Sequence, residues 1–374
     1  SEFMAAAVIR AAAARTHALR DGRASVLAVA GRGMHSARIE STDEPVIQRM
    51  RTLVQSAPEG TLSLAQGITS WGPPEEALTE AAAAVREQAT GVYGPGEGIQ
   101  TLRDAFAASL DSDFGVRGVE VMVTAGANQA YVNTVLATMD HGDAAVLFAP
   151  YYFNHRMAIQ MCGHAADLLT GPATGPDLLP DLDWLERTLG ERNPIGKTGG
   201  QGRVRLVTLV TPCNPTGANV PQGLVDRAVN LCEAYGAWLF LDHAYAHFIH
   251  DGSRLATRTG PHVLSGFSLS KAFGMAGWRI GCLAYPPALR EQLLKAQDTA
   301  VICPTIISQR AALGALRAGS SWVHRQVAGL SQQREMIRDA LRPLGDDAVA
   351  GGGGAIYLLA RLPPQHADDV HVAE

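Results

Sequence analysis

Mostly apolar runs alternate with helical stretches along the chain from about Leu62 onward. Six of the runs have the pattern of strands, and those at 203–212 and 237–245 have the pattern of buried ones. They are VEVMVTAG (119–126), AAVLFAP (144–150), RVRLVTLVTP (203–212), AWLFLDHAY (237–245), HVLSGFSLSK (262–271) and WRIGCLAYP (278–286). The segment 127–140 follows the first run and has the pattern of a helix. This alternation predicts an α/β fold with a mostly parallel sheet between helices, in which the last run returns against the others.

The pattern changes after the last of these strands. Residues 287–344 are helical in period and are broken at Cys303-Pro304. Earlier in the chain, the polar, Gly-rich stretch 190–202 predicts a surface loop. A new strand pattern begins at AVAGGGGAIYLLARLP (348–363), and the sequence ends soon afterwards at Glu374. We therefore expect a large domain and a smaller second domain that is truncated.

Composition and charge argue against several classes of protein. The chain has 374 residues, of which 47% are hydrophobic and 18% charged, so it is not expected to be disordered. Its net charge of -5 and its lack of a basic stripe argue against nucleic-acid binding. No uncharged apolar run reaches the roughly 18 residues of a membrane-spanning helix. The five cysteines form no C-x-x-C pair, which favours reduced thiols.

The N-terminal segment differs from the rest of the chain in charge. Ser1, Glu2 and Phe3 precede Met4 and have the pattern of a cloning remnant. Between Met4 and Ile39 there are six arginines and one acidic residue. This composition is typical of a mitochondrial or plastid transit segment, but an Ala-rich extension from a GC-rich genome would look the same. The expected compartment is therefore the cytoplasm, or one of those organelles if the segment is a transit peptide.

Amine chemistry has few candidates in this chain, because only three of its 31 basic residues are lysines. Lys271 lies in SGFSLSKAFGMAGWRIG, at the end of a predicted strand among small and aromatic residues. An apolar setting lowers the pKa of a lysine and yields the neutral amine that Schiff-base chemistry needs. Arg279 follows eight residues later and suits a phosphate, which Ser268 and Ser270 could also bind. A purely structural lysine is the alternative interpretation.

Polar residues follow two other predicted strands. Asp242 ends WLFLD, Tyr245 comes three residues later, and Asn214 lies in TPCNPTG. Ligands of open α/β sheets bind at the carboxyl ends of the strands, so we expect these side chains at one crevice. A buried carboxylate needs a cationic partner, which a protonated pyridine nitrogen would provide. The Asn214 amide could donate to a phenolate oxygen, although N-P-T-G is also an ordinary turn.

Two further elements belong to the candidate site. The turn 124–128 (TAGAN) joins a strand to a helix N-terminus, where free N–H groups and the helix dipole favour an anion. Tyr152 comes two residues after Pro150 and could stack on a planar ring or pack as a core aromatic. No metal site is expected, because His243 and His247 lack the glutamate of the zinc motif.

Taken in order, these motifs form a set. YGPGEGI, TAGANQA, APYY, NPTG, the Asp242–Tyr245 pair and SLSK with Arg279 resemble the class I/II aminotransferases, which are fold-type-I transferases that use pyridoxal 5′-phosphate (PLP). The likeness runs from about Leu62 to Pro363. The longer segments SLAQGITSWGPPEEAL, VMVTAGANQAYVN, FAPYYFNHRMAIQMCG and PTIISQRAALGAL are most similar to plant and algal aromatic or methionine aminotransferases. Kynurenine aminotransferases and C–S lyases are related.

The resemblance implies a role for each candidate residue. Lys271 would form a Schiff base with PLP and move the Cα proton, and Asp242 would pair with the pyridinium nitrogen. Asn214 and Tyr245 would hold the ring oxygen, and Tyr152 would stack on the ring. The residues assigned to the phosphate and its surroundings are Ala127, Asn128, Ser268, Ser270 and Arg279.

The resemblance also implies a homodimer. Tyr93 would reach the phosphate bound by the partner subunit, and Gly67 would lie beside the substrate carboxylate, near Asn214. The family's C-terminal arginine, which clamps the substrate α-carboxylate, has no matching position before Glu374, since Arg361 comes too early.

The expected organisation follows from the same comparison. Residues 1–40 would be an N-terminal extension, 41–90 an arm and part of the small domain, 91–290 the large PLP-binding domain, and 291–374 an interdomain helix with the start of the C-terminal small domain. The implied reaction moves an amino group between an aromatic amino acid or methionine and an aromatic 2-oxo acid. The alternatives are a PLP-dependent C–S lyase, or a truncated PLP-binding homologue with impaired turnover.

Overall fold

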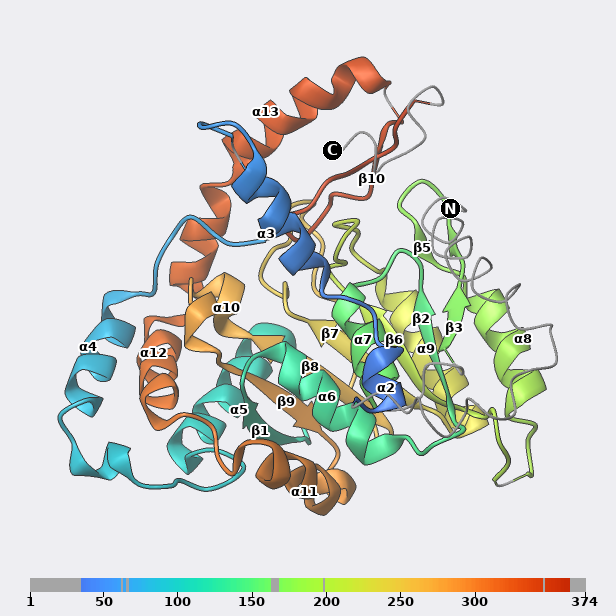
Figure 1. Ribbon diagram of the computed structural model, residues 1–374, viewed down its shortest axis with the longest axis horizontal. Helices are drawn as coiled ribbons and strands as arrows, with labels where there is room; N and C mark the ends of the chain where they lie inside the picture. Colours follow the sequence, from blue (N-terminus) through green and yellow to red (C-terminus); the bar gives the residue numbers. More distant parts are fainter. Residues whose placement is uncertain are drawn as a thin grey trace, which may run out of the picture.

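The computed structural model describes residues 35–61, 63–64, 67–162, 168–197, 199–345 and 347–363. Within these residues the largest sheet has seven strands in the order β1-β9-β8-β7-β6-β2-β3 (Figure 1). They are β1 (Glu120–Thr124), β2 (Ala144–Phe148), β3 (Leu168–Gly171), β6 (Val204–Val210), β7 (Trp238–His243), β8 (Val263–Ser268) and β9 (Gly281–Tyr285). Neighbouring strands from β3 to β8 pair in parallel, whereas β9 runs antiparallel to β8 and β1. The predicted mostly parallel sheet with a returning last strand is confirmed.

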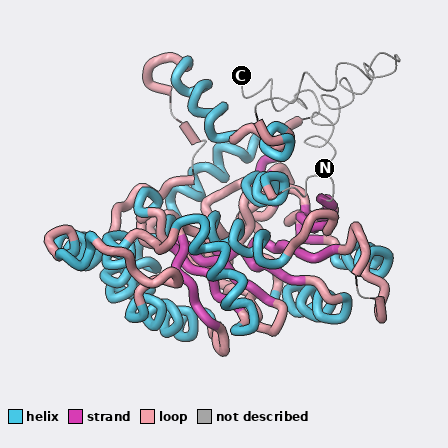
Figure 2. Tube along the Cα trace, turned by 60° about the horizontal axis from the view of Figure 1, so that its bottom comes forward, coloured by secondary structure: helices cyan, strands magenta, loops and turns pink. Residues whose placement is uncertain are grey.

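Helices cover both faces of this sheet (Figure 2). One face packs against α6 (Ala127–Thr138), α7 (Phe153–Met161) and α11 (Arg290–Val301), and the other against α5 (Gln100–Phe114), α8 (Leu182–Arg192), α9 (Gln222–Tyr235) and α12 (Ile306–Ala328). Strand β2 shows how the sequence produces this arrangement. Val146 and Phe148 join the core on the α8–α9 face, and Ala145 and Leu147 join the core on the α6–α7 face. A strand buried on both faces needs apolar residues at every position, which explains the continuous apolar runs.

Some local predictions were wrong at their boundaries. Strand β8 ends at Ser268 instead of continuing to Lys271, and a short helix, α10 (Leu269–Ala272), begins there. The Ser268 hydroxyl accepts a hydrogen bond from the Ser270 N–H at 3.1 Å, which is a typical helix N-cap. Helix α8 extends to Arg192, so the Gly-rich loop starts later than predicted. The sequence does not predict β3, whose four residues carry too short a pattern.

The helical region after the sheet is interrupted at Cys303-Pro304, as predicted, and α12 begins at Ile306. Gly319 adds a second interruption inside α12, where its backbone angles are not helical. Beyond α13 (Ser331–Leu341), the predicted strand pattern appears as two short paired strands, β10 (Val349–Ala350) and β11 (Leu359–Ala360). A second small ladder joins β4 (Ala173–Thr174) to β5 (Leu179–Pro180).

The N-terminal part of the chain contributes three helices to the described residues, α2 (Ala37–Glu40), α3 (Val46–Ser56) and α4 (Glu75–Ala84). Figure 1 shows α3 and α13 on the same side of the large sheet, above α10. Most of the Arg-rich segment, with its predicted transit peptide, lies outside the described residues. Among the described helices none combines the length and apolar character needed to cross a membrane.

Helices α4 and α12 pack closely, which fixes residues 75–84 to the body of the protein. Ala77, Ala81 and Ala84 are the buried residues of α4, and they face small residues of α12. A methyl group on Gly314 of α12 would collide with the backbone of Glu76 and would lie 2.8 Å from Cα of Ala77. Only glycine therefore allows this helix crossing.

We predict that Gly314→Ala lowers the free energy of unfolding by about 1–3 kcal/mol, because backbone atoms cannot yield to the added methyl group as a flexible side chain could. Gly223→Ala in α9 is the matched control, because the added methyl group would meet nothing within 4 Å. Its effect should be less than about 1 kcal/mol and favourable. Urea unfolding of the three proteins measures the difference, and equal midpoints for Gly314→Ala and wild type would contradict the close crossing.

Candidate active site

The carboxyl ends of β6, β7 and β8 meet at one edge of the sheet. Val210 pairs with Asp242, and Asp242 pairs with Gly266, so these three positions form a row across the strands. Asn214 follows β6 in a half-buried loop, and Lys271 follows β8 on α10. The fold thus brings the segments that carry Asn214, Asp242 and Lys271 to a common crevice, where ligands of open α/β sheets bind.

Lys271 is held by a segment from the N-terminal part of the chain. Its Nζ donates a hydrogen bond to the Gly67 carbonyl, and the Thr69 hydroxyl donates to the Lys271 carbonyl at 3.4 Å. The Trp71 indole N–H donates to the Ala272 carbonyl at 3.2 Å. Burial lowers the pKa of Lys271, and the positive charge of Arg279 lowers it further. A larger fraction of this amine is therefore neutral than of an ordinary lysine.

Asp242 is 5% exposed and is held by two donors. Its Oδ1 accepts a hydrogen bond from the Ala244 N–H at 2.9 Å, and its Oδ2 lies 3.0 Å from Nε2 of His155. His155 is itself 2% exposed, and its ring lies 4.2 Å from that of Tyr131, centroid to centroid. Because a carboxylate oxygen can only accept, the proton of this bond is on Nε2 of His155. The imidazole therefore fixes the orientation of the carboxylate.

Sequence reasoning missed His155. The residue lies three positions after Tyr152 at the start of α7, and the two rings meet edge to face at 5.4 Å. Tyr152 is the N-cap residue of α7, and the third helical residue after a cap lies close to it, so this spacing was a usable signal. Tyr152 is half-buried, and its hydroxyl accepts a hydrogen bond from the Asn154 amide at 2.9 Å.

Tyr245 contacts a residue that the sequence does not single out. Its hydroxyl lies 2.5 Å from the hydroxyl of Tyr357, and the two rings are 5.3 Å apart at an angle of 77°. Burial raises the pKa of Tyr245 well above its ordinary value, and the neighbouring Tyr357 raises it further. Tyr245 is therefore a neutral phenol that can donate a hydrogen bond.

A cationic region lies on the side of β8 away from Asp242, where β1 ends and β9 begins. Gly126 precedes α6, so Ala127 and Asn128 are the first residues of that helix and their N–H groups lie at its positive end. Arg279 donates to the Ala125 carbonyl at 2.9 Å, and its guanidinium covers Gly126. Asn128 is exposed and Ser270 is buried.

The start of β9 joins this turn to Ser268. A Cβ on Gly281 would lie 3.1 Å from Cα of Gly126 and 3.2 Å from Cα of Ser268. The loop before α6 and the cap of α10 are therefore neighbours. Together they can offer N–H groups, a hydroxyl and a guanidinium to one anion.

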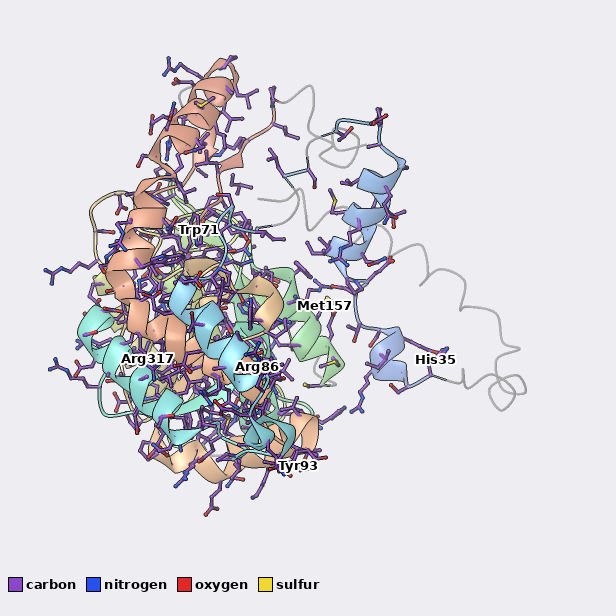
Figure 3. The ribbon with its side chains drawn as sticks, turned by 90° about the vertical axis from the view of Figure 1, so that its left-hand side faces the viewer. His35, Trp71, Arg86, Tyr93, Met157 and Arg317 are labelled. Carbon is purple, nitrogen blue, oxygen red and sulfur yellow. The ribbon has the colours of Figure 1, made fainter. Side chains whose placement is uncertain are left out.

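The structure does not bring Tyr93 to this crevice. Its side chain is 79% exposed and lines a separate pocket of about 470 Å³ with Ile306, Arg310 and Arg317. Figure 3 shows Tyr93 at one end of the molecule, away from Trp71, which contacts the residue next to Lys271. The predicted contact with a partner subunit stays a prediction.

The two histidines that could suggest a metal site have other surroundings. The ring nitrogens of His243 lie 2.9 Å from the Thr211 carbonyl and 3.0 Å from the Thr257 hydroxyl. The ring of His247 packs at 4.9 Å against that of Phe114. Burial lowers the pKa of each histidine to about 4. Both are part of the packed interior.

Comparison with known proteins matches most of the chain. The aminotransferase class I and II family matches residues 59–373. The aromatic aminotransferase ISS1 of Arabidopsis thaliana is 43% identical over 343 residues, which cover 91% of this chain and 84% of the relative. The aspartate/prephenate aminotransferase of Thermus thermophilus is 28% identical over 84% of this chain and 80% of its own. The solved structure of N-succinyldiaminopimelate aminotransferase from Mycobacterium tuberculosis has a TM-score of 0.75 at 26% identity, covering 86% and 82% of the two chains.

We predict that acetic anhydride acetylates Lys271 at a lower pH than the other lysines, because only a neutral amine attacks the anhydride and the pKa of Lys271 is lowered. Peptide mass spectrometry of the cofactor-free protein gives the rate at each lysine as a function of pH. The exposed Lys197 and Lys295 are internal controls. The pH midpoint is the readout, because it does not depend on how accessible each amine is. A midpoint for Lys271 equal to that for Lys295 would contradict the prediction.

Proposed function

The chain belongs to the class I and II aminotransferases, and we propose that it moves an amino group from an aromatic amino acid or methionine to an aromatic 2-oxo acid, with PLP as cofactor. The observation that carries this proposal is the position of Lys271, whose pKa is lowered, on α10 directly after β8, the strand that pairs with β7 and its buried Asp242. Its relative from Arabidopsis thaliana is named an aromatic aminotransferase.

The donor set around Lys271 fits PLP. When bound, this cofactor supplies an aldehyde that condenses with amines and a ring that accepts an electron pair. Asp242, oriented by His155, is the carboxylate that would hold a protonated ring nitrogen. The neutral phenol of Tyr245 would donate to the ring oxygen, with the Asn214 amide. Arg279 and the first N–H groups of α6 would hold the phosphate.

Lys271 is the residue suited to proton transfer. Its amine is neutral more often than that of an ordinary lysine, so it can accept a proton from the substrate Cα and return it. The Gly67 carbonyl accepts a hydrogen bond from Nζ and holds it in position. The Trp71 indole N–H donates to the carbonyl of the next residue, Ala272, and so ties the same short helix to residues 67–71.

Two tyrosine side chains lie against Gly67, the residue proposed to border the substrate carboxylate. A Cβ on Gly67 would lie 3.1 Å from Cζ of Tyr357 and 3.2 Å from the hydroxyl of Tyr245. This lining supports an aromatic or thioether side chain as the part of the substrate that distinguishes it from other amino acids.

The decisive experiment is a half-reaction with the purified protein. We expect PLP to give a visible absorption band that L-Phe, L-Tyr, L-Trp or L-Met removes and phenylpyruvate restores. Lys271→Ala should abolish the band and reduce turnover by about 10² to 10⁴-fold, since it removes the general base. Lys295→Ala is the matched control, because Lys295 is exposed and bonded to Gln292.

The same experiment separates the alternatives. Release of ammonia and an oxo acid without an acceptor would indicate a C–S lyase instead of an aminotransferase. A visible band that persists after each of the four amino acids is added would indicate a PLP-binding protein with impaired turnover. A band that survives in Lys271→Ala would overturn the whole assignment.

We also propose a homodimer in which Tyr93 of each subunit completes the site of the other. The exposed Tyr93 and Val92 line the pocket beside Arg310, and they supply apolar surface for a second copy. Lys271→Ala and Tyr93→Ala homodimers should each be nearly inactive. Co-expressed at equal levels, they should recover about a quarter of wild-type activity, because half of the dimers then carry one intact site.

Two differently tagged chains allow the mixed dimer to be isolated and assayed. The double variant Lys271→Ala/Tyr93→Ala co-expressed with wild type is the control, since such a mixed dimer has no intact site. Recovery that does not exceed the sum of the two inactive proteins would contradict the shared site.

A further inference from the structure

The hydroxyl pair of Tyr245 and Tyr357 joins two distant parts of the chain beside Lys271. Tyr245 follows β7, and Tyr357 lies between β10 and β11. Their hydroxyl oxygens are 2.5 Å apart. Gly67, which accepts the hydrogen bond from Lys271, lies directly against this pair. A methyl group on Gly67 would overlap the Tyr357 hydroxyl and would lie 3.2 Å from that of Tyr245.

The backbone before Tyr357 is fixed against the loops that follow β6 and β7. Gly352 donates to the Thr216 carbonyl at 3.0 Å, and the N–H of Ala355 donates to the Phe248 carbonyl at 2.9 Å. The imidazole of His250 lies 2.8 Å from the Ala355 carbonyl, to which its Nε2 donates. Tyr357 is therefore placed by main-chain contacts with the segments that position Asn214 and Tyr245.

Each of the two hydroxyls carries one proton, and only one of these protons can lie between the two oxygens. If Tyr245 donates to Tyr357, its proton is no longer available to a ligand. If Tyr357 donates instead, Tyr245 accepts and keeps its own proton for another acceptor. The geometry of the pair allows both arrangements, and the ligand determines which one is favourable.

Resting on the function proposed above, we propose that Tyr357 is a positioning residue of the active site. Its hydroxyl donates to Tyr245 and thereby directs the Tyr245 proton toward the ring oxygen of the cofactor. Donors connected in series polarise one another, so Tyr245 also becomes a stronger donor. Gly67 is required at its position because the two hydroxyls fill the space of a side chain.

The consequence is measurable in the cofactor spectrum. A stronger donor stabilises negative charge on the ring oxygen and so lowers the pKa of the proton that the Lys271 nitrogen shares with that oxygen. Tyr245→Phe should raise the pH midpoint of the visible band by about 1–2 units, as expected for a lost hydrogen bond to a charged group. Tyr357→Phe should raise it by roughly a few tenths of a unit, because it removes only the polarising donor.

The experiment titrates the visible band of the PLP-loaded wild type, Tyr245→Phe, Tyr357→Phe and the double variant. We expect the double variant to have the midpoint of Tyr245→Phe alone, because Tyr357 acts only through Tyr245. Tyr285→Phe is the matched control: its buried hydroxyl has no hydrogen-bond partner in the described part of the chain, and its loss should leave the midpoint unchanged.

The outcomes separate this inference from the proposed function. A wild type that takes up PLP and transaminates, with the same midpoint in Tyr357→Phe, would overturn the role of Tyr357 alone. Shifts that add in the double variant would show a merely structural effect and would also overturn it. A wild type that shows no band would overturn both proposals.

Gly67→Ala provides a second route to the same result, should Tyr357→Phe fail to fold. The added methyl group displaces the Tyr357 hydroxyl without removing it. We expect an upward shift of the midpoint like that of Tyr357→Phe, and no such shift when Gly67→Ala is made in the Tyr245→Phe protein. A shift of the same size in that background would contradict the proposal.

Discussion

The burial of Asp242 at the end of β7 is the constraint on which the site depends. A carboxylate that is 5% exposed is costly unless donors surround it. The fold supplies the Ala244 N–H from the following turn and His155 from α7. Because α7 must bring an imidazole to this point, Tyr152 at its start is placed beside the same crevice. One buried charge thus determines the positions of two neighbouring side chains.

The two outer segments of the chain depend on this centre in a different way. Residues 67–71 cover α10 through bonds to Lys271 and Ala272, and residues 352–357 lie against the loops after β6 and β7. They meet at Gly67 and Tyr357. The strand ends supply the charged groups, whereas the outer segments supply a neutral, aromatic boundary. Such a boundary lowers the local dielectric and strengthens each interaction within it.

The parts of the fold and site that could be predicted from the sequence are those with a local pattern of residues. The strand that carries Asp242 and the strand that precedes Lys271 are continuous apolar runs, and the sheet order brings their ends together. Tyr357, by contrast, contacts Tyr245 across 112 positions, and no local pattern predicts such a contact. The boundary of β8 was predicted too late because a single side chain, that of Ser268, ends the strand by capping α10. Long-range contacts and caps are where the sequence pattern is least informative.

The charges at the strand ends give the crevice a direction. Thr124 of β1 pairs with Gly281 of β9, and Gly281 pairs with Ser268 of β8. Arg279 and the N-terminus of α6 therefore lie beside these three strands, at one side of the crevice. Asp242 lies one strand further, on β7. A ligand with an anionic group at one end and a protonated nitrogen at the other would meet opposite charges in one orientation only. In the reverse orientation both groups would face like charge, at a cost of several kcal/mol in a water-poor site. The order of the strands, rather than any single side chain, therefore selects how such a ligand binds.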